Sequence, residues 1–221
     1  MINRREAGLR LYEALKYLGS SDTVVMALPR GGVVVGAEIA KRLGSPLGVV
    51  LVRKIGYPYN PEYAIGAIAE GEKPVFNYGD IYVLDGHWLA DVEAQAREII
   101  NERRKYYYDH LKRPEVKDKT VILVDDGMAT GLTMKAAISA VLSLRPKKII
   151  VAVPVASTDS IKLIEDLVDS ILLVEDPNYF MGAVGMHYMN FKEVTDQYVR
   201  NLLRNVNHQK VDLFSSEYIT Y

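Results

Sequence analysis

The sequence contains no cysteine, which excludes disulfide bonds, thiolate metal sites and cysteine nucleophiles. It also lacks an excess of charge of one sign: 27 Lys and Arg stand against 28 Asp and Glu, for a formal net charge of -1. No global basic field exists to hold nucleic acid, so any anion must be bound locally. No apolar run reaches the roughly 18 residues that a bilayer requires, and the amphipathic start is unlike a secretory signal. We expect a soluble cytoplasmic protein that binds neither nucleic acid nor membranes.

What is present is the composition of an ordinary globular chain. Hydrophobic residues make up 49% and charged residues 25% of the 221 residues, a length that suits one domain. We expect a single domain over 1–221. It would consist of an N-terminal helix within 1–20, a core over 21–175, and a small C-terminal cap with a polar tail over 176–221.

Strand-like and helix-like segments alternate along the core. The five apolar runs of strand length are 23–28, 47–52, 120–124, 148–155 and 170–174. They are rich in Val and Ile and do not alternate with polar residues, which is typical of strands buried on both faces of a parallel sheet. Helical stretches at 33–44, 87–111, 131–144 and 160–168 lie between them. This pattern predicts an α/β fold with a doubly wound, mainly parallel sheet flanked by helices.

Residues 55–80 interrupt that alternation. The segment is rich in Gly, Pro and Tyr and has no steady hydrophobic period. Long excursions of this kind in compact domains often serve as lids or binding loops. We therefore expect a flexible loop at about 55–80.

The clearest local signal is a turn between a buried strand and a helix at 121–141. Gly127 and Gly131 allow close backbone approach, and Thr130 and Thr133 add hydroxyl donors. A helix that follows a parallel strand presents free N–H groups to an anion at the carboxyl edge of the sheet. The turn from 129 to 133 therefore suits a single phosphate.

The two carboxylates before this turn suit a different group. Asp125 and Asp126 accept hydrogen bonds and repel phosphate, so they fit sugar hydroxyls. Neighbours on a strand point to opposite faces, which argues against a shared two-metal site. The triphosphate-binding, dinucleotide-binding and serine-hydrolase motifs are all absent from the sequence. The class of ligand that remains is one with a phosphate beside a polyhydroxyl group.

A strand followed by DDGMATGLT resembles the binding motif of type I phosphoribosyltransferases, which hold 5-phosphoribosyl-1-diphosphate (PRPP). The resemblance implies that Asp125 and Asp126 bind the ribose 2′ and 3′ hydroxyls and that the following turn binds the 5′-phosphate. The residues implied to contact ribose and phosphate are Asp125, Asp126, Gly127, Met128, Ala129, Thr130, Gly131, Leu132 and Thr133.

Two further segments extend this resemblance over about residues 20–200. ALPRGGVVVGAEIA resembles the first strand and pyrophosphate loop of the family, which implies pyrophosphate binding by Arg30, Gly31 and Gly32. VLVRKIG ends the next strand, where Arg53 and Lys54 would neutralise the leaving pyrophosphate. Segment 55–80 takes the place of the family's flexible catalytic loop, and the terminal cap that of its hood.

The implied function is transfer of the phosphoribosyl group from PRPP to a nitrogenous base or similar acceptor, with release of pyrophosphate. Asp125, Asp126 and Lys54 would be the catalytic residues. Mg²⁺ would be held mainly by PRPP and water near the two Asp residues, with no direct protein ligand, and the protein would form a homodimer. A PRPP-sensing regulator that has lost activity is the alternative, and a phosphosugar hydrolase is a third class.

The sequence narrows the range of possible acceptors but does not identify the acceptor. Members that act on 6-oxopurines carry an acidic residue four positions after the first Asp, where this chain has Ala129. Adenine-type, pyrimidine-type and other acceptors stay open. Phe180 could stack on the acceptor base or pack in the hood, and we expect His187 to be a polar surface residue.

Within segment 55–80, four side chains are candidates for roles in a lid. Glu62 and Glu70 could act as acid or base groups, and Tyr57 and Tyr63 could contact a bound substrate. No fixed partner of any of them is visible in sequence, so solvated loop side chains are the alternative.

Overall fold

The computed structural model describes residues 1–19, 21–57, 60–76 and 86–215, with side chains left out at 60–63 and from 209 onward. Five parallel strands form the main sheet in the order β2-β1-β6-β7-β8. They are β1 (Thr23–Ala27), β2 (Leu47–Val49), β6 (Thr120–Val124), β7 (Lys148–Ala152) and β8 (Ser170–Leu172). All five predicted strands are present, but the run over 47–52 is divided, since β2 ends at Val49 and Val52 begins a strand of a second sheet.

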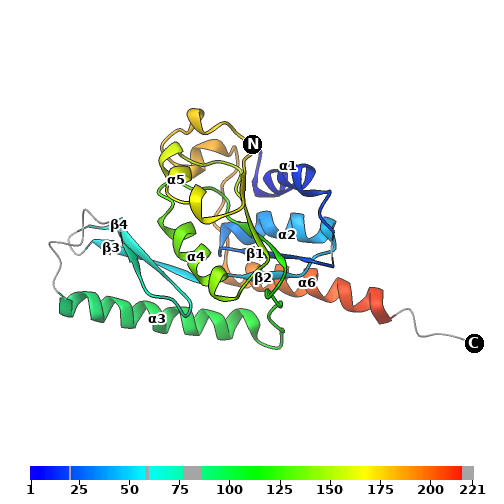
Figure 1. The fold of residues 1–221 in the computed structure, drawn as a ribbon, viewed down its shortest axis with the longest axis horizontal. Helices are drawn as coiled ribbons and strands as arrows, with labels where there is room; N and C mark the ends of the chain where they lie inside the picture. The colour runs from blue at the N-terminus through cyan, green and yellow to red at the C-terminus, as the bar shows by residue number, and fades with distance from the viewer. Residues whose placement is uncertain (20, 58–59, 77–85, 216–221) are drawn as a thin grey trace, which may run out of the picture.

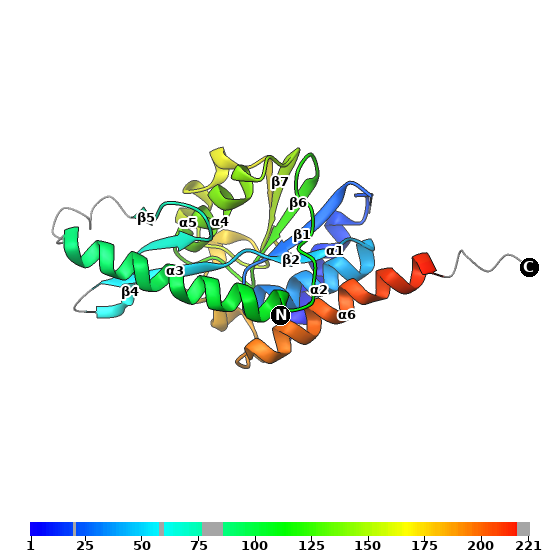
Figure 2. The same cartoon turned by 90° about the horizontal axis from the view of Figure 1, so that it is seen from below.

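Helices cover both faces of this sheet, as the doubly wound prediction requires (Figures 1 and 2). One face carries α1 (Arg4–Leu15), α2 (Gly31–Leu43) and α6 (Asp196–Ser215), and the other carries α4 (Leu132–Ser143) and α5 (Thr158–Lys162). The helix predicted over 160–168 is shorter than expected. It ends at Lys162 and is followed by a 3-10 turn at Glu165–Leu167.

Alternate residues of the central strands build two cores. On β1, Val25 and Ala27 join the cluster beneath α1, α2 and α6, whereas Val24 and Met26 join the cluster beneath α4. All four side chains are almost wholly buried. This two-sided burial explains why the strand sequences are continuous apolar runs.

Helix α1 packs outside α2, as its amphipathic pattern predicts. Ala7, Leu11 and Leu15 are fully buried at this contact. The two backbones approach so closely that a Cβ added at Gly8 would lie 2.7 Å from the carbonyl oxygen of Val35. This packing brings the start of α1 near the carboxyl edge of the sheet (Figure 1).

A second, antiparallel sheet lies to one side of the first. It consists of β3 (Val52–Tyr57), β4 (Asn60–Ala69) and β5 (Val75–Phe76), and the long helix α3 (Gly86–Tyr108) lies alongside it (Figure 2). The described part of 55–80 is therefore mostly paired strand, where the lack of period predicts an irregular loop. Gly66 in this segment serves packing, since a Cβ added there would lie 2.6 Å from the Phe76 ring.

The segment between β8 and α6 consists of short 3-10 turns at Pro177–Tyr179 and Val184–His187. Val199, Leu203 and Val206 of helix α6 pack into the core below α2. None of the helices in the described ranges is both long and apolar enough to cross a bilayer.

Candidate functional site

A cleft of about 740 Å³ opens at the carboxyl ends of β1 and β6. This is the edge at which open parallel sheets bind ligands. The sequence-predicted residues that line it are Arg30, Gly31, Lys54, Asp125, Asp126, Gly127, Met128, Ala129, Thr130, Gly131 and Thr133. Two segments almost a hundred residues apart in the chain thus meet in one cavity, because β1 and β6 are neighbours in the sheet.

The turn after β6 is shaped for an anion. Gly131 has a φ of 77° and begins α4 with no side chain capping the first turn, so the helix leaves free N–H groups at the cleft. Two serine hydroxyls at the N-terminus of α5 hold this turn through its backbone carbonyls. The Ser157 hydroxyl donates to the Ala129 carbonyl at 2.6 Å, and the Ser160 hydroxyl donates to the Met128 carbonyl at 3.0 Å.

The helix after β1 presents a second uncapped N-terminus to the same cleft. Helix α2 begins at Gly31, and no side chain caps it. The Pro29–Arg30 peptide bond just before it is cis. A Cβ at Gly31 would lie 1.8 Å from Oδ2 of Asp126, and one at Gly32 would lie 2.8 Å from Cα of Asp125. Only glycine allows this loop to pack directly against the two carboxylates.

The two carboxylates have different partners. Oδ2 of Asp126 accepts a hydrogen bond from Nε of Arg4 at 2.6 Å, in an ion pair where both side chains are largely buried. Oδ1 of Asp125 accepts the Asp126 backbone N–H at 2.8 Å. Burial and the adjacent Asp126 carboxylate raise the pKa of Asp125 well above its ordinary value, and Lys54 acts in the opposite direction. The ionised form of Asp125 is thus disfavoured, and a hydroxyl donor or a cation would stabilise it.

The three predicted cations are placed differently. Lys54 lines the cleft, whereas its strand neighbour Arg53 lines a separate small cavity next to α3, because successive side chains on a strand point to opposite faces. Arg30 lies at the cleft, but its Nη2 donates to Oε1 of Glu193 at 2.8 Å and its Nη1 lies 3.9 Å from Asp196. Of these three predicted cations, Lys54 is the one whose charge lowers the pKa of Asp125, while Arg4 pairs with Asp126.

Among the described side chains, Phe191 is the aromatic residue that lines the cleft, and Phe180 packs in the hood, which is the second of its two predicted placements. The Phe180 ring stacks on His187 with centroids 5.3 Å apart, and Phe180 is not among the cleft-lining residues. The Phe191 ring lines the cleft, lies 5.0 Å from the Tyr188 ring, and has the Arg4 guanidinium 3.7 Å above its centroid. The hood has no regular period, so sequence offered no signal to choose between the two rings.

His187 is not the surface residue that the sequence suggests. It is 5% exposed, its Nδ1 lies 2.6 Å from Oε2 of Glu175, and its Nε2 accepts the Met181 backbone N–H. Its neighbour Tyr188 donates from its hydroxyl to the Asp126 carbonyl at 2.6 Å. Both residues therefore fix the hood against the site. The expectation fails because the hood folds back over the sheet edge.

Tyr57 and Glu70, the two candidates in segment 55–80 whose side chains the structure describes, do not line the cleft. Glu70 lies in a second cavity, paired with Arg104 and Arg113, and Tyr57 packs against the main core. Residues Glu62 and Tyr63 fall on β4, and their side chains lie outside the described residues. Glu70 and Asp125 line different cavities, so Glu70 is not placed to act as an acid or base in the cleft.

No group of three or more His, Asp or Glu side chains that could hold a metal occurs among the residues that the structure describes. The carboxylates that line the cleft are Asp125, Asp126 and Glu193, and Glu193 is paired with Arg30. Carboxylate oxygens suit Mg²⁺, which keeps several water ligands and is usually bound through one or two carboxylates plus substrate phosphates. The two Asp carboxylates fit a Mg²⁺ ion that arrives with a phosphorylated ligand.

The sheet, the two helix N-termini and the paired carboxylates define an α/β protein with a polar cleft at the carboxyl edge of its sheet. A family model described as "Phosphoribosyl transferase domain" matches residues 6–188. The chain belongs to this family of transferase domains, which confirms the resemblance seen in its sequence.

The chain is also similar to individual proteins. The crystal structure of TT1426 from Thermus thermophilus has 42% sequence identity and a TM-score of 0.77, and the match covers 93% of this chain and 99% of that one. A Mycobacterium tuberculosis protein named "Putative phosphoribosyl transferase" is 35% identical over 89% of this chain and 45% of its own length. The "Bifunctional protein PyrR" of Pediococcus pentosaceus is 32% identical over 58% of this chain and 70% of its own length. The chain thus spans about half the length of the mycobacterial relative.

Proposed function

We propose that this protein transfers the phosphoribosyl group of PRPP to a nitrogenous base or similar acceptor and releases pyrophosphate. One observation carries the proposal: two uncapped helix N-termini, at Gly31 and Leu132, flank the carboxylates of Asp125 and Asp126 in one cleft. PRPP carries phosphate groups at two ends of a ribose with two free hydroxyls. The spacing of anion sites around hydroxyl acceptors supports this ligand.

In the proposed reaction the bond from ribose C1 to the diphosphate oxygen breaks, and a bond from C1 to the acceptor nitrogen forms. The acceptor loses its proton, and the diphosphate leaves with the bonding electron pair. Asp125 and Asp126 accept the ribose hydroxyls, the turn at 129–133 binds the 5′-phosphate, and Lys54 stabilises the charge that develops on the diphosphate. Mg²⁺ near the two Asp residues would neutralise further charge on the diphosphate.

Binding of PRPP is expected to fall by at least about 100-fold in the double variant Asp126→Asn, Thr130→Ala, because hydrogen bonds to charged groups each contribute about 1.5–3 kcal/mol. Calorimetric titration with PRPP and Mg²⁺ measures this. Asp166→Asn, an exposed carboxylate outside the cleft, is the matched control and should bind like the parent protein. Parent-like affinity in a folded double variant would refute the PRPP site.

A screen for pyrophosphate release over purine, pyrimidine and other nitrogen bases then tests the reaction. Release with one acceptor would establish the transferase and name its substrate. Binding without release from any acceptor would favour a PRPP-sensing regulator. Release of ribose 5-phosphate without an acceptor would indicate a hydrolase.

Phe191 lines the cleft and is 38% exposed although the Arg4 guanidinium covers one face of its ring, and this exposed surface supports a planar acceptor. Ala129 at the family's acidic position argues against a 6-oxopurine. Phe191→Ala is expected to raise the KM for the acceptor roughly 10-fold with little change in the KM for PRPP, because stacking on an aromatic ring contributes about 1–3 kcal/mol per base. Steady-state kinetics with each substrate varied in turn measures this. Phe180→Ala is the control, since its ring stacks on His187 away from the cleft. A larger KM change for Phe180→Ala would reverse the assignment.

A further inference from the structure

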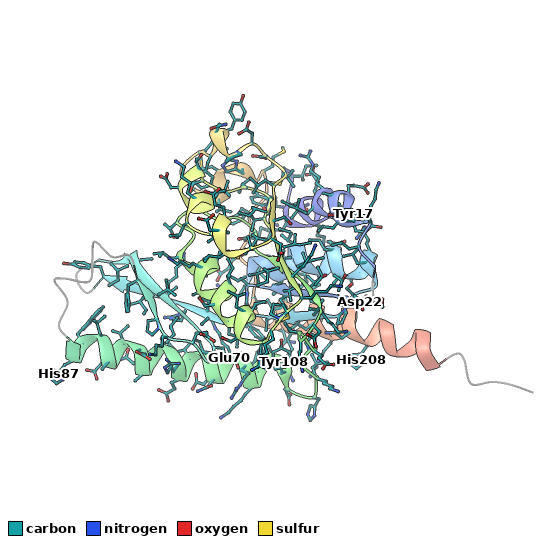
Figure 3. All side chains as sticks on the ribbon, in the orientation of Figure 1. Tyr17, Asp22, Glu70, His87, Tyr108 and His208 are labelled. Atoms are coloured by element: carbon teal, nitrogen blue, oxygen red, sulfur yellow. The ribbon has the colours of Figure 1, made fainter. Side chains whose placement is uncertain are left out.

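A second cavity, of about 390 Å³, lies between α3, α4 and the end of β4. Its floor is apolar and includes Met26 of β1, Val50 just after β2, and Val141 of α4. Its size falls within the range of small-molecule sites, roughly 300–1,000 Å³. Figure 3 shows Glu70 beside α3, at one wall of this cavity.

The charged residues of the wall are three arginines and one glutamate. Arg97, Arg104 and Arg113 line the cavity together with Glu70. The Glu93 carboxylate, which does not line the cavity, accepts a hydrogen bond from Arg97 in an ion pair. Because Arg97 is neutralised by Glu93, Arg104 and Arg113 against Glu70 leave an excess of one positive charge. Side chains of Arg104 and Arg113 are 44% and 42% exposed, so a ligand from solvent can reach them.

Glu70 occupies the position that an external anion would take. Its Oε1 accepts from Arg104 and from Nη1 of Arg113, each at 3.1 Å, and its Oε2 accepts from Nη2 of Arg113 at 3.0 Å. Such a two-pronged contact shows that the Arg113 fork is already oriented for a carboxylate or a phosphate. The Glu70 side chain is only 13% exposed, so its carboxylate acts as an internal counter-ion within the cavity.

We propose that this cavity binds a small phosphorylated ligand with a flat apolar part, the chemistry of a nucleoside monophosphate. The phosphate takes the place of the Glu70 carboxylate on Arg104 and Arg113, and the base lies on the apolar floor. Binding here does not depend on the proposed transfer reaction. The site is nevertheless close to the cleft, because Val50 lines both cavities.

The test uses the full chain with the cleft disabled by Asp126→Asn and Thr130→Ala, so that nucleotide bound in the cleft is not measured. Adenosine and uridine monophosphates are titrated by calorimetry, with inorganic phosphate in parallel. One saturable site is expected for at least one nucleotide. Adding Arg104→Ala and Arg113→Ala should weaken that binding at least 10-fold, because two charge-assisted hydrogen bonds are lost. Adding Arg42→Ala, on an arginine of α2 outside both cavities, should leave it unchanged.

A second variant gives an effect of opposite sign. Glu70→Gln removes the internal counter-ion and should tighten nucleotide binding several-fold, which loss of structure would not do. No saturable nucleotide binding, an unchanged affinity in the folded double arginine variant, or an unchanged or weaker affinity in Glu70→Gln would each overturn the proposal. Phosphate that binds as tightly as the nucleotides would overturn the part that concerns the apolar floor. Failure of the proposed transferase would appear separately, as absence of PRPP binding in the parent protein.

Discussion

Lys54→Met is expected to lower kcat for pyrophosphate release by about two to three orders of magnitude, the usual effect of removing one preorganised group that stabilises charge in the transition state. Lys54 lines the cleft on β3 and is the cation that weakens the rise in the pKa of Asp125. Methionine keeps the apolar stem and removes the charge. Single-turnover and steady-state assays would separate this loss from any change in PRPP affinity.

Arg53→Met is the matched control for that measurement. Arg53 is the preceding residue of the same strand, and it faces a small cavity lined by Ile99, Ile100 and Arg103. The same change of charge at this neighbour is expected to alter kcat by less than a few-fold. Equal losses in the two variants would show that general electrostatics act instead of a positioned lysine, and an unaffected Lys54→Met would remove Lys54 from the mechanism.

Asp125→Asn is expected to weaken PRPP binding roughly 10- to 100-fold and yet to make the free protein more stable to heat. Binding falls because a charged acceptor for a ribose hydroxyl becomes neutral. Stability rises because burial and the adjacent Asp126 raise the pKa of Asp125, so the ionised carboxylate opposes folding at neutral pH. The asparagine oxygen can still accept the Asp126 backbone N–H.

The sign of this stability effect can be checked against pH. A carboxylate whose pKa is raised by folding binds more protons in the folded state, so the stability of the parent falls as pH rises above the ordinary value of 3.8. The gain in melting temperature from Asp125→Asn should therefore be small at the lowest pH and grow toward neutral pH. Thermal unfolding of both proteins across that range measures it, and Asp166→Asn serves as the control. A gain that shrinks as pH rises would contradict the assignment.

Much of the fold follows from local sequence because the main sheet is buried on both faces. Burial requires unbroken Val and Ile runs, so all five strands are visible as such. The strands within segment 55–80 cannot be predicted from the hydrophobic pattern, because β4 carries glycines within a strand. Gly66 packs against Phe76, a contact made only through the antiparallel pairing of β4 with β5. A glycine-rich strand of this kind looks like a loop when its partner is not known.

The site residues likewise fall into those that the local sequence predicts and those that depend on tertiary contacts. The turn after Asp125 and Asp126 is a local motif, so its residues lie together in the cleft as its sequence predicts. Arg4 could not be found, because it is 122 positions from its partner Asp126 and reaches it only through the packing of α1 on α2. Phe191 depends on how the hood folds back. Contacts of this kind come from tertiary structure and leave no periodic signal.

The pairing of β1 with β6 also determines when the cleft can form during folding. Thr23 pairs with Thr120, so the antiparallel sheet and α3 must be enclosed within the chain loop that this contact closes. Long loop closures are entropically costly and slow. Gly31 and Asp126 meet only after the closure, so no partly folded state without the β1–β6 pair contains the binding site. A ligand of the cleft therefore stabilises the closed sheet selectively, and its binding energy adds to the cooperativity of the whole fold.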